Sequence, residues 1–106
     1  MKLTIDVSVF VASTLSWGRV WGPAEFPVVP AIGTTISFAV PMKEGAHVPS
    51  GFSAELRVES VVFRPNVKDE TGVMVFLEDL VVESMEQAAA VAEYLEQAFD
   101  LFADKY

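Results

Sequence analysis

The sequence predicts an α+β fold: a small curled antiparallel β-sheet or partly open barrel of about four or five strands, with one C-terminal amphipathic helix. Three observations support this. All six glycines and all six prolines lie at or before Gly72. Apolar residues in that part recur every second position, as they do in strands. Beyond Ser84 they recur at three- and four-residue spacing, as they do in a helix. A chain of 106 residues can bury one core, so we expect a single domain over 1–106, β-rich over 1–82.

The predicted strands follow from this alternation. The first runs from Leu3 to about Val11, and a second covers 34–40, which is rich in β-branched residues. A third covers 54–63, where the alternation slips by one residue and predicts a β-bulge near Glu59–Ser60. The apolar run 73–82 is typical of one central strand covered on both faces. Glycine and proline interrupt 17–30 and 41–52, so we expect loops there, with at most a short strand at 19–21.

The predicted helix spans about 84–103. Ser84 and Gln87 have the spacing of a capping box, in which each side chain satisfies a free backbone N–H at the helix start. One stripe of the helix is apolar: Ala88, Val91, Ala92, Leu95, Phe99 and Phe102. The opposite side carries the acidic residues Glu86, Glu93, Glu96 and Asp100.

Charge and hydropathy separate along the chain. The net charge is −8 although 52% of the residues are apolar, and an apolar content this high excludes intrinsic disorder. Residues 1–68 carry a net charge of +1, whereas residues 69–106 carry −9. We expect the acidic helix side to face solvent; the alternative is an acidic decoy or inhibitor that binds a basic protein through it. No basic patch is present, so we expect no direct binding of nucleic acid.

Several classes of site are excluded by composition. Without cysteine there is no disulfide, no thiol chemistry and no cysteine-based zinc site, and His47 is the only histidine. No serine lies in a nucleophile-elbow motif, and the adjacent Glu78 and Asp79 would point to opposite faces of a strand. We therefore predict no catalytic residue, no metal ligand and no cofactor. The longest uncharged stretch, 26–42, contains three prolines and cannot be a spanning helix, so we expect no membrane contact. Asp6 and the strand-like alternation argue against a signal peptide at the N-terminus, so a cytoplasmic protein is expected.

The best candidate for function is a group of aromatic residues. Trp17, Trp21 and Phe26 lie within ten residues of one another among glycines and prolines. A loop buries three large aromatics only by folding onto the core or by meeting a partner, and tryptophan is enriched at binding hot spots. We therefore predict a non-enzymatic protein that binds a protein partner or forms homo-oligomers. Two alternatives stay open: the tryptophans plug the core, or this segment forms a small-ligand site or a small active site.

Overall fold

The computed structural model describes residues 1–12 and 14–106, and it describes their side chains except that of residue 70. Within that part the chain forms seven strands, one 3₁₀ turn and one α-helix. In chain order these are β1 (Lys2–Val11), β2 (Leu15–Glu25), β3 (Thr35–Ser37), β4 (Glu55–Phe63), η1 (Glu70–Gly72), β5 (Val73–Leu77), β6 (Leu80–Val82), α1 (Met85–Phe99) and β7 (Phe102–Lys105).

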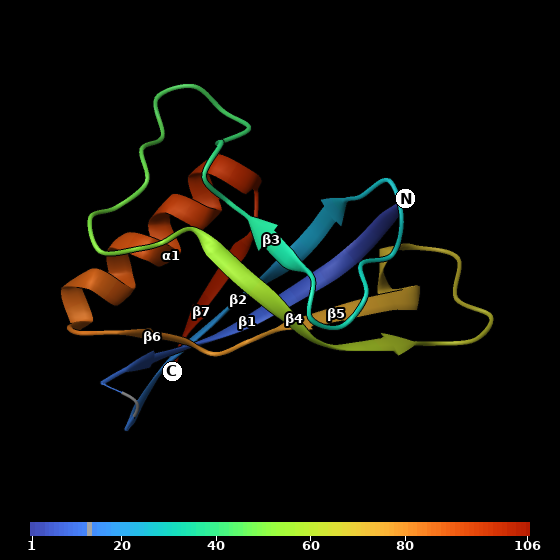
Figure 1. The fold of residues 1–106 in the computed structure, drawn as a ribbon, viewed down its shortest axis with the longest axis horizontal. Coiled ribbons are helices and arrows are strands. Elements are labelled where there is room, and N and C mark those ends of the chain that lie inside the picture. The colour runs from blue at the N-terminus through green and yellow to red at the C-terminus, as the bar shows by residue number, and fades with distance from the viewer. Residues whose placement is uncertain (13) are drawn as a thin grey trace.

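The strands form one open sheet in the order β3-β4-β5-β1-β2-β7, and β6 continues beside β1 beyond the end of β5 (Figure 1). The α+β class and the C-terminal helix are confirmed. The strand number is higher than predicted, and the sheet is mixed rather than antiparallel, because β5 and β6 both run parallel to β1. The sheet does not close into a barrel, because β3 and β7 stand at opposite ends of the order without pairing.

The single strand predicted over 73–82 is in fact two strands. The chain leaves the ladder at Glu78, whose backbone N–H donates to the backbone oxygen of Arg57 at 2.9 Å. The Glu78 carboxylate in turn accepts the Arg57 N–H at 3.1 Å. These two bonds turn the chain toward β4 between β5 and β6. The predicted bulge is confirmed, because the register of β4 against β5 shifts between Val58 and Ser60. The predicted strand over 34–40 is reduced to β3.

The loop predicted over 17–30 was wrong for most of its length, because it belongs to β2. Gly18 is needed there, since β7 passes so close that no side chain fits. Pro23 pairs with Thr4 of β1 beyond the stretch Gly18–Trp21 that pairs with β7. Proline has no N–H to donate, and at Pro23 the side of β2 away from β1 is a free sheet edge. Strands tolerate proline at such edges.

The helix begins as predicted and ends earlier. The Ser84 hydroxyl accepts the Gln87 N–H at 3.1 Å, and the Gln87 side chain accepts the Glu83 N–H at 2.9 Å. The expected end near 103 was wrong: α1 stops at Phe99, because Asp100 adopts the left-handed conformation with φ of 57°. The chain then turns back and runs along β2 as β7.

The core lies between one face of the sheet and α1. Leu3, Ile5, Val7 and Val9 of β1 are buried on this side, as are Val91 and Leu95 of the helix. Ala88, Ala92 and Ala98 are also buried, and their small size lets the helix lie close to the sheet. The segment 38–54 folds over the same side (Figure 1). There Phe38 and Phe52 contact the aromatic rings of the helix. In the described residues, no helix is long and apolar enough to cross a membrane.

Candidate functional site

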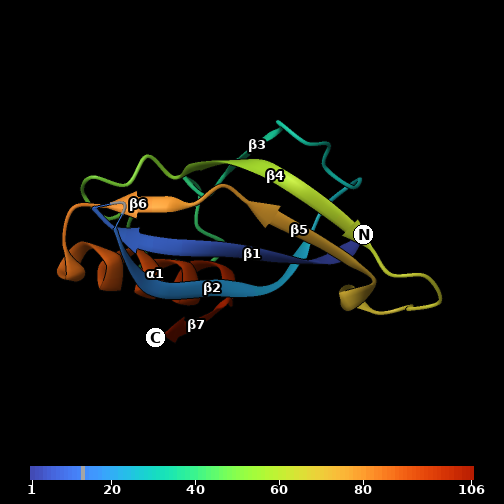
Figure 2. The same ribbon diagram turned by 90° about the horizontal axis from the view of Figure 1, so that it is seen from below.

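The sheet has a second face, which α1 does not cover. Figure 2 shows the strands spread side by side, with the helix behind β1 and β2. Residues directly paired across neighbouring strands project to the same face. Asp6 is paired with Trp21 and with Phe76, and Trp21 is paired with Phe102. These side chains alternate with the core residues of β1, so they lie on the side away from the helix, which we call the open face.

Five residues on the open face form a connected network, the Trp21 cluster: Asp6, Arg19, Trp21, Phe102 and Asp104. The Asp6 carboxylate lies 3.2 Å from the Arg19 guanidinium, which is placed 5.0 Å from the centre of the Trp21 ring. The Trp21 indole N–H donates to the Asp104 carboxylate at 2.8 Å. The other side of Trp21 meets Phe102, with 5.0 Å between ring centres. The indole ring is therefore held by Arg19 of its own strand and by Phe102 and Asp104 of β7.

The charges of the cluster are unevenly solvated. Asp6 is only 9% exposed, and this burial raises the pKa of its carboxyl group, an effect that the Arg19 charge partly opposes. Arg19 and Asp104 are more exposed, and a longer contact of 3.9 Å joins them. The cluster holds no hydroxyl, thiol or imidazole that could act as a nucleophile. It combines tryptophan with arginine, the pair of residue types most enriched at binding hot spots.

The three aromatic residues predicted from the sequence are placed in three different surroundings. Trp17 lies where the register of β2 slips against β1, and with 6% exposure it belongs to the core. Trp21 is half-buried at the centre of the Trp21 cluster. Phe26 follows the end of β2 and lines a cavity on the helix side of the sheet. Trp21 alone of the three is on the open face.

The acidic residues of the helix are all exposed. Glu86 lies in the first turn, and Glu93 accepts a hydrogen bond from the Gln97 amide at 3.1 Å. Glu96 also faces solvent, whereas Asp100 ends the helix and forms an ion pair with Lys43. This arrangement fits a solvated helix side. Binding of a basic protein through these residues stays a prediction.

Sequence reasoning missed four members of the cluster: Asp6, Arg19, Phe102 and Asp104. Phe102 was assigned to the apolar stripe of the helix, and its true position follows from the early end of α1. The one available signal was Asp6, a charged residue inside an otherwise apolar alternating strand.

The structure also places the remaining candidates from the sequence. His47 is exposed in the segment before β4. Among the described residues, no group of three or more histidine, cysteine, aspartate or glutamate side chains is arranged to hold a metal ion. Comparison with known protein families, curated proteins and solved structures finds nothing that matches this chain. Within the described residues, the open face and the cavity beside Phe26 are the candidate sites.

Proposed function

We propose that the protein is a non-enzymatic binding protein that self-associates, with the open face of its sheet as the contact surface. The observation that carries this proposal is the Trp21 cluster, an ordered aromatic and charged group on a sheet face that the helix does not cover. A sheet face with this composition is normally buried against a second layer.

Exposed apolar residues elsewhere on the open face support the same conclusion. Phe102 is 52% exposed, and Val62 of β4 and Val81 of β6 are 43% and 48% exposed. Val62 is paired with Met74, and Val81 with Phe10, which places both valines on the open face. Exposed apolar side chains gathered on one face mark interaction sites in proteins.

A second copy of the chain is the partner that this surface fits best. The cluster contains both a guanidinium and carboxylates, so two copies related by a twofold axis can place Arg19 of one chain beside Asp104 of the other. In the plane of Figure 2, where the strands lie side by side, the molecule measures 40 by 23 Å. A face of that extent offers the roughly 800 Å² per partner that a stable interface needs.

Sedimentation velocity between about 5 and 100 µM tests the proposal, and the native protein should sediment as a species of twice the chain mass. Phe102→Asp places a charge on the open face and should return the protein to a monomer. The matched control is Phe63→Asp at the end of β4. Phe63 is 65% exposed, and its pairing with Val73 places it on the face opposite the open face. A native protein that stays monomeric at 100 µM, or a Phe102→Asp variant that remains dimeric, overturns the proposal.

A further inference from the structure

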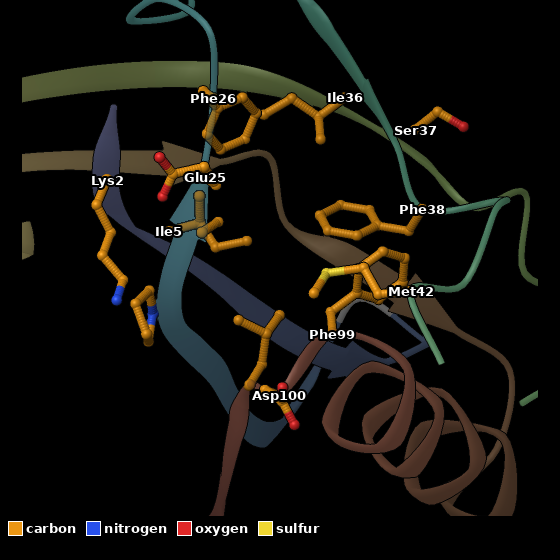
Figure 3. A pocket seen from close by; sticks show the side chains of 13 residues that line it. Lys2, Ile5, Glu25, Phe26, Ile36, Ser37, Phe38, Met42, Phe99 and Asp100 are labelled. Carbon is orange, nitrogen blue, oxygen red and sulfur yellow. The ribbon is translucent and has the colours of Figure 1, made fainter. Parts of the chain in front are cut away.

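A cavity of about 480 Å³ is lined mainly by residues on the helix side of the sheet, together with Lys2 and Pro23 at the end of β1 and β2. It is enclosed by the start of β1, the end of β2, the segment 36–42 and the end of α1. Figure 3 shows Phe26 and Ile36 on one wall, and Phe38, Met42 and Phe99 on another. Ile5 lies between these walls in Figure 3, and Leu101 also lines the cavity. The volume falls within the range of small-molecule sites.

The walls of the cavity are fixed by hydrogen bonds. The Phe38 N–H donates to the Ala54 oxygen at 2.6 Å, and the Phe38 oxygen accepts the buried hydroxyl of Tyr94. The Met42 N–H donates to the Ala98 oxygen at 3.1 Å. On the opposite wall, the Phe26 N–H donates to the Met1 oxygen at 2.8 Å. The cavity therefore exists before any ligand enters, which lowers the entropic cost of binding.

The charged groups at the mouth leave one cation without an acidic partner. Glu25 lies 3.3 Å from the N-terminal ammonium group, and Asp100 is paired with Lys43. Lys2 also lines the cavity, beside Glu25 in Figure 3, and within the described chain it forms no ion pair. An unpaired ammonium group beside an apolar hollow favours a ligand with an apolar body and an anionic end.

We propose that this cavity binds a small amphipathic carboxylate, of the class of medium-chain fatty acids. The alkyl chain contacts the walls formed by Phe26, Phe38 and Phe99, and the carboxylate lies at the mouth beside Lys2. This activity is separate from self-association, because no residue that lines the cavity belongs to the Trp21 cluster.

Isothermal titration of the native protein with the carboxylates of six, eight and ten carbons tests the apolar part. Each added methylene should tighten binding about fourfold while the cavity is filling. Octanol and octylamine test the charge, and octanoate should bind more tightly than either. Absence of any chain-length trend, or equal binding of the amine and the carboxylate, overturns the proposal.

Variants of the protein locate the site. Lys2→Gln should weaken octanoate binding about threefold and leave octanol unchanged, a factor typical of a solvent-exposed ion pair. Lys105→Gln on β7 removes the same charge away from the cavity and should have no effect. Ala24→Leu fills the cavity and should abolish binding of all three ligands, whereas Ala31→Leu, on the exposed segment before β3, should not. Unchanged binding in a folded Ala24→Leu variant overturns the proposal.

Discussion

The close packing of β7 on β2 at Gly18 makes a sharp prediction about a single methyl group. A Cβ atom added to Gly18 would lie 2.2 Å from the backbone oxygen of Asp104 and 2.8 Å from the Cα of Lys105. Real Cβ atoms stay beyond 3.0 Å of their neighbours, and both of these neighbours are backbone atoms that no rotamer change can move. Gly18→Ala therefore has to push β7 away from the sheet.

The cost follows from the contacts that β7 makes. Its displacement breaks the hydrogen bond from Trp21 to the Asp104 carboxylate and separates Trp21 from Phe102. A hydrogen bond to a charged group contributes about 1.5–3 kcal/mol and an aromatic pair about 0.5–1.5 kcal/mol. Allowing for the partial exposure of these groups, we expect a loss of about 2–3 kcal/mol. This corresponds to a fall in Tm of about 10–20 °C in a domain of this size.

Thermal unfolding followed by circular dichroism measures the loss, and a red shift of tryptophan emission reports the release of Trp21. Gly45→Ala is the control, because Gly45 has φ of +88° and its added Cβ meets nothing within 4 Å. That variant should cost only the left-handed backbone penalty of about 1–2 kcal/mol, with unchanged emission. Alanine at an unconstrained strand position stabilises a protein slightly, so a Gly18→Ala variant as stable as the native protein would refute the reasoning.

Other positions give smaller and equally specific effects. Ser84→Ala removes the oxygen that caps α1 and should lower the free energy of unfolding by about 1 kcal/mol in a urea titration. Arg19→Met leaves the Asp6 carboxylate in its buried position without a cation, and should cost about 1–2 kcal/mol near pH 7. Burial raises the pKa of Asp6 above 3.8, so the folded state holds this proton more tightly than the unfolded state. The native protein should therefore gain stability relative to Asp6→Asn as the pH falls from 7 through the folded pKa toward 3.8. If the difference in free energy of unfolding between the two proteins stays constant over this range, the raised pKa of Asp6 is contradicted. Asp100→Ala should be about 1 kcal/mol less stable than Asp100→Gly, because both lose the same ion pair and only alanine is strained at φ of 57°; equal stabilities would count against a left-handed helix end.

The parts of the fold that could be predicted are those set by neighbouring residues. The alternation in β1 reports that one face of this strand meets the core. The slip after Val58 reports the bulge, because a single extra residue reverses the side of every later side chain. The Ser84 cap depends on a hydrogen bond across three residues, which the sequence displays directly.

The parts that could not be predicted depend on contacts distant in sequence. Glycine and proline in β2 indicate a loop when taken locally, and only the arrival of β7 explains why Gly18 suits a strand. The helix end was missed because an aspartate, rather than a glycine, takes the left-handed position. The parallel pairing of β5 with β1 joins segments that no local pattern connects.

The candidate site shows the same division. Trp21 could be selected by its residue type, but its partner Asp104 lies 83 positions further along the chain. The cluster exists only because β7 returns to the sheet edge. Neither Arg19 nor Phe102 therefore carries a sequence signal that separates it from an ordinary surface or core residue.

Asp6 links the fold to the proposed interface. A one-residue slip of β1 would turn Asp6 toward the helix and expose the core side chains Ile5 and Val7, so its charge opposes the wrong register. In the observed register its carboxylate is still buried, and the raised pKa means that this burial disfavours the charged form. Arg19 partly offsets that cost and is itself positioned against Trp21. The Asp6 charge thus keeps the apolar side of β1 toward the core and also orders the side chains of the open face. The contact surface therefore forms only when β1 pairs in the correct register.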